Sequence, residues 1–130
     1  MLSERRRAKI KIIINEVPLS KNKYVNMHWA KRAKYKEMID WLICSKTLNT
    51  YYFKSYFLLR KSKITFDIYF KTNRRRDVQN YVGGGLIAWL DALVKAEIIA
   101  DDSNDCIGQP IVNFHIDKAN PRTEIIIEGR

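Results

Sequence analysis

Acidic side chains and a dense basic run stand unusually close together between residues 73 and 103. Asp77 directly follows Arg74–Arg76, and Asp101 and Asp102 follow an apolar segment with helical spacing. Magnesium prefers oxygen ligands, and one or two carboxylates suffice when water and a substrate phosphate complete the coordination. If the apolar helix returns the chain to the region of Asp77, this spacing predicts a magnesium site beside a phosphate-binding surface.

A divalent ion in such a site can generate hydroxide and offset the charge that develops on a phosphodiester under attack. Asp77 and Asp102 are the candidate ligands, with Asp101 as a further one, and neighbouring cations would position the DNA backbone. The candidate DNA-contacting side chains are Lys21, Lys23, Lys71, Arg74, Arg75 and Arg76. The alternative is structural, with Asp77 and Asp102 as helix or turn caps paired with arginine. The spacing leaves both interpretations open.

The three arginines cannot all point into one site, because side chains alternate between faces in an extended segment. The loop 19–26 could line a substrate groove through Lys21–Tyr24, or it could be a solvated connection. Gly83–Gly85 have no Cβ atoms and so permit backbone to approach another group closely. A helix start behind such a loop can receive phosphate, but no Gly-Lys-Ser/Thr follows, so the pattern is not a Walker loop.

Charge narrows the class of partner. The net charge is +10, with 20 basic and 5 acidic residues over positions 1–76 and 4 basic and 9 acidic residues over positions 77–130. Such a basic excess releases counterions when it binds a polyanion, which favours nucleic acid as the partner. The alternative is a basic protein whose lysines are simply solvated.

Length and composition predict one domain over residues 1–130, with residues 1–8 as a flexible basic arm. No apolar stretch is long enough for a bilayer span or a signal peptide, so we expect a cytoplasmic protein without a membrane partner. Cys44 and Cys106 lack the spacing of a metal site or a disulfide framework, and we expect buried free thiols.

Alternating apolar residues predict the strands. Residues 9–16 carry three consecutive isoleucines, and residues 63–71 place Ile64, Phe66, Ile68 and Phe70 on one face. Further strands are predicted over 56–59, 107–117 and 123–128, with a turn at 118–121.

Helical spacing predicts two main helices. The first begins near Met27, with Asn26 as its N-cap and His28 as a packed or capping side chain. Its apolar face is predicted to include Ala30, Ala33, Met38, Trp41, Leu42 and Leu48. The second covers residues 86–97 with a broad apolar face and Asp91 beside it. The order of elements predicts an α+β fold, with a mixed sheet covered by two helices.

The runs RRRDVQN and LDALVKAEIIADDS resemble the signature region of the RusA-type Holliday junction resolvases, a family often carried by phages and prophages. The opening strand, the turn at residues 18–20 and the helix around His28 and Trp29 resemble that family less specifically. The resemblance implies a homodimeric, magnesium-dependent endonuclease, with manganese as a substitute ion, that makes paired incisions in four-way DNA junctions during recombination and repair.

Under this resemblance Asp77 matches the first family aspartate, Asn80 the motif asparagine and Asp102 the closing catalytic aspartate. Asp91, with the alanine and leucine after it, matches the helix signature. Gln79 stands where the family has a second aspartate, which keeps an oxygen ligand among the catalytic residues but removes one negative charge.

Other departures concern the motif lysine and the helix end. The family lysine is absent, and Lys71, Lys95 or an arginine from 74 to 76 could replace it. Residues 81–85 include an insertion, and Glu97 stands where the family usually has glycine.

The predicted function is therefore a junction-resolving endonuclease, and the alternative is a catalytically impaired relative that binds branched DNA without cutting it. A different phosphodiesterase or a protein-interaction role is a further alternative. Symmetric incision needs two sites related by a two-fold axis, and the candidate dimer surfaces are residues 51–56 and the helix at 86–97.

Overall fold

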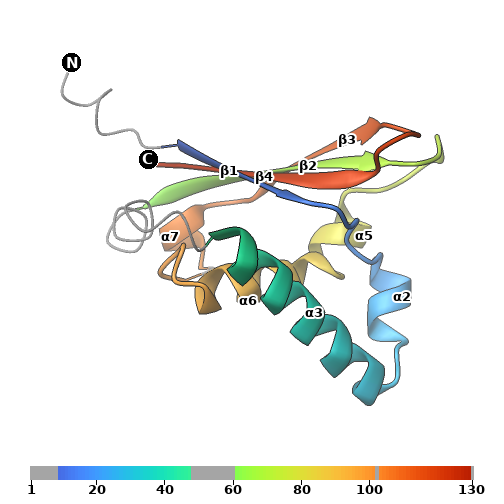
Figure 1. Ribbon diagram of the computed structural model, residues 1–130, viewed down its shortest axis with the longest axis horizontal. Coiled ribbons are helices and arrows are strands. Elements are labelled where there is room, and N and C mark those ends of the chain that lie inside the picture. The colour runs from blue at the N-terminus through green and yellow to red at the C-terminus, as the bar shows by residue number, and fades with distance from the viewer. Residues whose placement is uncertain (1–8, 48–60, 102, 130) are drawn as a thin grey trace.

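A four-stranded mixed sheet forms the framework of the protein. The computed structural model describes residues 9–47, 61–101 and 103–129 (Figure 1). The strands β1 (Lys9–Ile14), β2 (Ser62–Phe70), β3 (Ile111–Ile116) and β4 (Arg122–Gly129) lie in the order β1-β4-β2-β3. β3 runs parallel to β2, and the other two pairings are antiparallel. The expected α+β class with a mixed sheet is confirmed.

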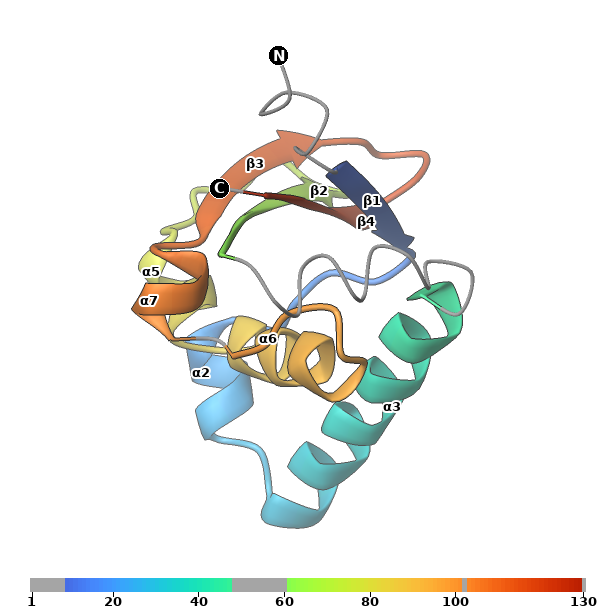
Figure 2. The same ribbon diagram turned by 90° about the vertical axis from the view of Figure 1, so that its left-hand side faces the viewer.

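All described helices lie on one face of this sheet (Figure 2). They are α2 (Lys21–Val25), α3 (Trp29–Thr47), α5 (Gln79–Val82), α6 (Leu86–Lys95) and α7 (Asn104–Ile107). The two longest, α3 and α6, pack against each other, as expected for a two-helix cover. α5, α6 and α7 form the crossover that two parallel neighbouring strands require. Within the described ranges, no helix combines the length and apolarity that a membrane span needs.

Alternating isoleucines bury the covered face of the sheet. In β2 the predicted inward positions are all buried, and Ile64, Phe66 and Ile68 are fully so. β1 and β4 also bury alternate residues on this face, and these are Ile10, Ile12, Ile14, Ile125 and Ile127. Each strand places every second side chain on the same face, so one face becomes the core and the other stays open.

The predicted apolar face of α3 is right only in part, because Leu42 packs against the core but Ala33, Met38 and Trp41 are exposed. Ile39, Ile43 and Thr47 are buried, whereas Met38 is 38% and Trp41 68% exposed. The line through positions 39, 43 and 47 meets α6 and β1, and Met38 and Trp41 point away from it toward solvent. Cys44 and Cys106 are free thiols, as expected. They are not buried as predicted, because Cys44 is exposed and Cys106 is half-buried.

The start of α3 also differs from its prediction. Asn26 ends α2 rather than capping α3. His28 takes the capping role, because its Nδ1 accepts a hydrogen bond from the Ala30 N–H at 3.2 Å. This confirms one of the two roles expected for His28.

Three element boundaries differ from the prediction. The segment 19–26, predicted as a loop, contains α2, and Tyr24 of this helix is buried. β1 ends at Ile14, and residues 104–107 form α7, so β3 begins only at Ile111. The strand predicted at 56–59, the aromatic segment 51–56, Leu48 and residues 1–8 lie outside the described residues.

α6 ends in a left-handed residue that is not glycine. Glu97 has φ 60°, and the N–H groups of Glu97 and Ile98 donate to the carbonyls of Val94 and Leu93 at 3.0 and 3.1 Å. These two bonds form a Schellman-type helix end, whose left-handed position normally holds glycine. The Cβ of Glu97 is therefore strained, at the position where the resemblance to RusA-type resolvases implies glycine.

We predict that Glu97→Gly raises the free energy of unfolding by about 1 kcal/mol, because it removes the left-handed strain of a side chain. Urea denaturation measures the change. Glu97→Ala keeps the Cβ and is the matched control, with no comparable gain expected. Equal stability of the glycine and alanine variants would contradict the strain at this residue.

Candidate functional site

A close contact between two backbone segments builds the site. The Gly85 N–H donates to the Leu19 carbonyl at 2.8 Å. A Cβ on Gly84 would lie 2.5 Å from the Lys21 nitrogen, and one on Gly85 would lie 2.5 Å from the Leu19 nitrogen. Real Cβ atoms do not approach so closely, so both positions require glycine. The glycines thus hold the α5–α6 turn directly against the segment that leads into α2.

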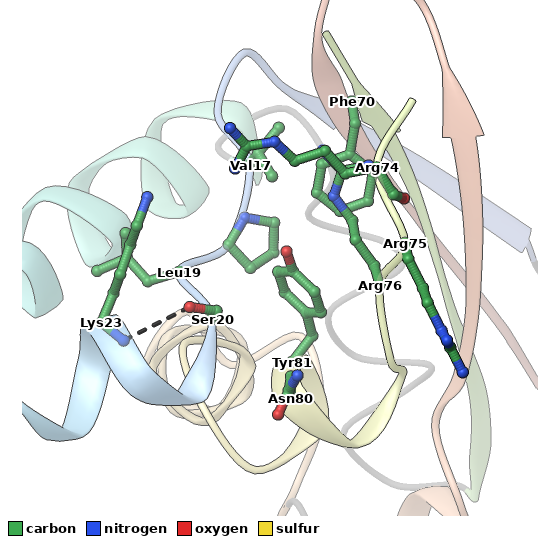
Figure 3. Close-up of a pocket in the computed structure, with 11 residues that line it drawn as sticks. Val17, Leu19, Ser20, Lys23, Phe70, Arg74, Arg75, Arg76, Asn80 and Tyr81 are labelled. Atoms are coloured by element: carbon green, nitrogen blue, oxygen red, sulfur yellow. Dashed lines mark hydrogen bonds between the residues drawn. The ribbon is translucent and has the colours of Figure 1, made fainter. Parts of the chain in front are cut away.

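A basic hollow of about 360 Å³ lies between these two segments (Figure 3). Its wall on one side comes from the chain before and within α2, and on the other side from the loop after β2 and from α5. The lining residues are Val17, Pro18, Leu19, Ser20, Lys23, Phe70, Arg74, Arg75, Arg76, Asn80 and Tyr81. No carboxylate is among them, so the hollow is suited to an anionic ligand such as phosphate.

The three arginines divide between structural and exposed roles. Arg76 donates from Nη1 to the carbonyls of Thr72 and Arg74 at 2.9 and 3.2 Å, and its guanidinium carbon lies 3.8 Å from the centroid of the Phe70 ring. It therefore fixes the loop. Arg74 and Arg75 are exposed, and in Figure 3 Arg74 extends across the hollow toward Val17 while Arg75 points away. The expected division of the arginines between faces is confirmed.

Asp77 lies in a second hollow that continues the first. This hollow is lined by Arg75, Arg76, Asp77, Val78 and Asn80, three of which also line the basic hollow. Asp77 is exposed and its Oδ1 accepts the Gln79 N–H at 3.1 Å, while its carbonyl accepts the Asn80 N–H at 3.0 Å. Asp77 thus bonds the backbone of the turn that leads into α5, which agrees with part of the structural interpretation. None of the ion pairs among the described residues joins it to an arginine.

Asp77 lies in the connection between β2 and α5. β2 ends at Phe70, and Asp77 precedes the short helix α5. Gln79 is the first residue of α5; its side chain is exposed and lines neither hollow. Asn80 lines both hollows, so the motif asparagine, unlike Gln79, faces the candidate site.

The second acidic position is not joined to Asp77 within the described residues. Asp102 lies outside them, so its pairing with Asp77 stays a prediction. Asp101 is exposed and precedes α7, which Figure 1 places at the opposite end of the helical layer from α5. Asp101 lines neither hollow. In the part of the chain that the structure describes, no group of three or more His, Cys, Asp or Glu residues could hold a metal ion.

The remaining candidate side chains take different places. Lys23 lines the basic hollow, whereas Lys21 and Lys71 are exposed outside its lining. Asp91 pairs with Lys36 at 3.5 Å on the surface between α6 and α3. Lys95 lines neither hollow, and its Nζ pairs with Asp40 at 2.9 Å at the far end of α6. The hydrogen bond to Asp40 raises the pKa of Lys95 above its usual value.

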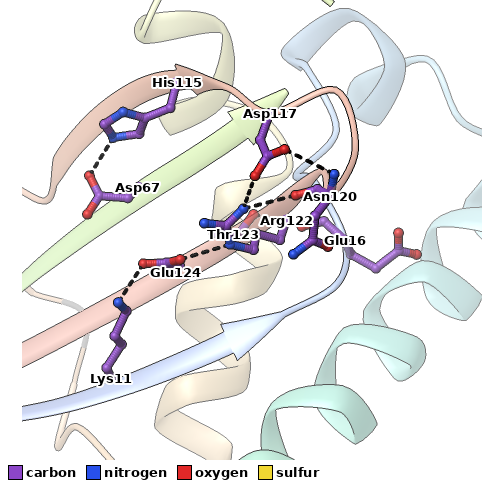
Figure 4. Close-up of polar contacts among 9 residues, drawn as sticks. All are labelled: Lys11, Glu16, Asp67, His115, Asp117, Asn120, Arg122, Thr123 and Glu124. Carbon is purple, nitrogen blue, oxygen red and sulfur yellow. Dashed lines mark hydrogen bonds and ion pairs between the residues drawn. The ribbon is translucent and has the colours of Figure 1, made fainter. Parts of the chain in front are cut away.

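A polar network on the open face of the sheet was not predicted (Figure 4). Glu124 is only 6% exposed, and its two oxygens contact Lys11 Nζ and Arg122 Nε, each at 2.8 Å. Arg122 also contacts Asp117 at 2.8 Å and lies over the Tyr69 ring at 3.8 Å. The alternation of opposite charges at positions 122 and 124 of a strand was the available signal, because such positions share one face.

A second pair stands beside this network. Asp67 Oδ1 contacts His115 Nε2 at 3.1 Å and accepts a hydrogen bond from Asn113 Nδ2 at 3.0 Å. The His115 ring stacks on Tyr69 with centroids 4.5 Å apart. These carboxylates are used in cross-strand contacts, so the open face is ordered by charge pairing.

The ion pairs shift the titration of their carboxyl groups. The hydrogen bond from Lys11, with the nearby Arg122, lowers the pKa of Glu124. The hydrogen bond from Arg122 lowers the pKa of Asp117 in the same way. Arg122, held by both carboxylates, stays charged across the accessible pH range.

Comparison with known proteins finds no family model that matches the chain and no curated protein that is similar to it.

We predict that Gly84→Ala and Gly85→Ala each lower the free energy of unfolding by about 3 kcal/mol, because a new methyl group would overlap backbone atoms that cannot move aside. Gly83→Ala is the matched control. Its Cβ would lie 3.3 Å from the Gln79 carbonyl oxygen, and a change within about 1 kcal/mol is expected. Thermal or urea unfolding measures the stability of the three variants. Equal losses of stability in all three would contradict the close backbone contact at Gly84 and Gly85.

We also predict that stability falls in acid through the open-face network. Both carboxyl pKa values are lowered on folding, so their stabilisation is complete above the usual values of 4.5 for Glu124 and 3.8 for Asp117. It is lost as the pH falls through the folded values. Urea titrations between about pH 6 and pH 3 should give a steeper loss of stability for the native protein than for Glu124→Gln. The same slope for both proteins would contradict this assignment.

Proposed function

We propose that this protein is a magnesium-dependent endodeoxyribonuclease that resolves four-way DNA junctions, with Asp77 as a catalytic carboxylate. The observation that carries the proposal is the place of Asp77, an exposed carboxylate in a hollow continuous with one lined by arginines and lysine. A phosphodiester bound by those cations would lie within reach of this carboxylate. The resemblance of the segments around Asp77 and Asp102 to RusA-type resolvases supports the same function.

The cations of the basic hollow would bind the DNA backbone. Arg74 and Arg75 are exposed and retain their guanidinium donors for phosphate oxygens, which arginine can contact in a bidentate manner. Lys23 lies on the opposite wall of the same hollow. A strand that enters between the two walls therefore meets positive charge on both sides, and binding should depend strongly on salt.

The acidic group would hold the ion and orient the attacking water. Asp77 Oδ1 accepts the Gln79 N–H at the start of α5, so its carboxyl group is fixed in direction before a ligand arrives. Magnesium, when bound, supplies an activated water and charge stabilisation. One described carboxylate fits a magnesium held mostly by water and phosphate, and Asp102 is the proposed second ligand. Asn80 lines both hollows and would hydrogen-bond the water or the phosphate.

The second candidate function is binding of branched DNA without cleavage. Gln79 favours this function, because its neutral side chain stands where RusA-type resolvases carry a carboxylate. The side chain of Gln79 also lines neither hollow. The cationic lining would be unaffected by that loss. The two functions therefore share one DNA surface and differ only in metal-dependent chemistry.

We further propose that the protein acts in the cytoplasm as a homodimer, because paired incision needs two sites related by symmetry. The apolar face of α6 is used within the chain, where Leu86, Ala88, Trp89, Ala92 and Leu93 are buried. The aromatic segment 51–56 lies outside the described residues. The open face of the sheet, with exposed Ile13 and Ile111, is the described surface most suited to a second copy.

We predict that the protein with magnesium cuts a synthetic four-way junction in two opposing strands. Asp77→Asn and Asp102→Asn should each lower the rate by roughly a hundredfold or more, since even outer partners of a metal site contribute up to about that factor. The side-chain carbonyl of asparagine accepts backbone N–H groups as well as a carboxylate does, so Asp77→Asn should retain the bond to the Gln79 N–H and bind the junction normally. Gel analysis of cleavage and of binding measures both effects.

Asp91→Asn is the matched control, because it neutralises a half-exposed aspartate that pairs with Lys36 on the surface. Its cleavage rate should equal that of the native protein, since such surface pairs contribute little stability. A junction that is bound but left uncut with magnesium and manganese would select the binding-only function. Loss of any preference among DNA forms at physiological salt would refute both.

A further inference from the structure

Three adjacent hollows share lining residues, and we refer to them together as the groove, which reaches the start of α3. The third is lined by Leu19, Lys23, Asn26, Met27, His28 and Lys31. It shares Leu19 and Lys23 with the basic hollow, which in turn shares three residues with the hollow of Asp77. Asp77 is the one acidic residue in these linings. The groove therefore offers positive charge along a path much longer than a single phosphate needs.

An exposed aromatic side chain stands at the far end of this groove. Trp29 is 75% exposed, more than any other large apolar side chain among the described residues. Its ring lies beside that of His28, with centroids 5.4 Å apart and planes inclined by 34°. His28 lines the third hollow, so the two rings together form an aromatic edge where the groove ends. Figures 1 and 2 place the turn between α2 and α3 at the tip of the molecule, away from the sheet.

We propose that Trp29, supported by His28, stacks on an unpaired base of the DNA strand that lies in this groove, so that the preferred substrate carries unpaired nucleotides next to the branch. The inference rests on the proposed function, because the strand in the groove is the one held against Asp77. Every base has a flat face that stacks on an aromatic ring, and lysines beside the ring hold the phosphates. Bases inside a duplex are stacked on one another and cannot reach it.

The turn that carries Trp29 is ordered without a ligand. Arg32 Nη2 donates to the carbonyls of Val25 and Met27 at 2.9 and 3.3 Å. The guanidinium carbon of Arg32 lies 5.4 Å from the centroid of the Tyr24 ring. Together with the His28 cap, these contacts fix the backbone on both sides of Trp29. A rigid aromatic anchor loses little conformational freedom on binding.

The surroundings of Trp29 favour DNA over a protein partner. The nearest hollow contains Lys23, Lys31, Asn26 and His28, whereas a protein interface usually surrounds its aromatic anchor with apolar contacts. Trp29 itself lines none of the three hollows and is connected to them through the ring of His28, which lines the third. The same helix carries a second exposed tryptophan, Trp41, which is 68% exposed and also lines none of them. It lies about 18 Å farther along the helix axis, so it tests whether exposure alone is enough.

The experiment measures binding of a fluorescein-labelled oligothymidylate of about ten nucleotides and of a duplex of the same length, by anisotropy in buffer without divalent ions. Trp29→Ala should weaken single-strand binding about tenfold or more and duplex binding less than about twofold, because only unpaired bases use the ring. Trp29→Phe should keep most of the affinity. Trp41→Ala is the matched control and should change neither.

Two results would overturn the inference. Either Trp29→Ala binds the single strand as tightly as Trp41→Ala does, or it weakens the single strand and the duplex equally. Cleavage of the four-way junction by the native protein is measured separately. A Trp29 effect without cleavage would refute the nuclease but keep the stacking site, and cleavage without a Trp29 effect would do the reverse.

Discussion

The arrangement of the candidate site depends on backbone meeting backbone at Gly84 and Gly85. The Gly85 N–H bonds to the Leu19 carbonyl, and no space is left for a Cβ on either glycine. This contact joins the α5–α6 turn to the chain that enters α2, although the two segments are far apart in sequence. The two walls of the basic hollow come from these same segments. The glycines therefore place Arg74 and Asn80 opposite Lys23 without touching a ligand themselves.

Charge in this protein is divided between two faces with different purposes. On the open face of the sheet, Lys11, Asp117, Arg122 and Glu124 satisfy one another, and the near-complete burial of Glu124 makes that pairing necessary. Along the groove, the cations outnumber the single carboxylate of Asp77. Positive charge that is left unneutralised in a concave surface attracts a polyanion, which is why the groove is the proposed DNA path.

Cleavage and simple binding would use this groove equally, and they differ in the acidic ligands at its end. Asp77 already has a structural role in the turn before α5, but its bond to the Gln79 N–H uses one carboxylate oxygen and leaves the group exposed. A structural role and a catalytic role are thus compatible in this residue. Gln79 has no such double role, because its backbone N–H contacts Asp77 while its side chain lies outside both hollows.

Local patterns in the sequence determined the sheet and the two main helices. The alternation of Ile64, Phe66, Ile68 and Phe70 predicts β2 correctly, because a period of two leaves no other way to bury one face. Glu97 was marked as unusual only by the resemblance to RusA-type resolvases, and it has a left-handed φ. The buried line of α3, however, was decided by contact with α6 and β1, since several lines around that helix contain apolar residues.

Only the tertiary structure decides how the candidate site is assembled. The sequence marked Asp77, the arginines and Lys23 as candidates, but only packing distinguishes Arg76, held on Phe70, from the exposed Arg74. The glycine triplet could have held a phosphate, and instead two of its members admit the backbone of Leu19 and Lys21. A contact between distant segments leaves no period or spacing in the sequence, because it depends on how the elements between them pack.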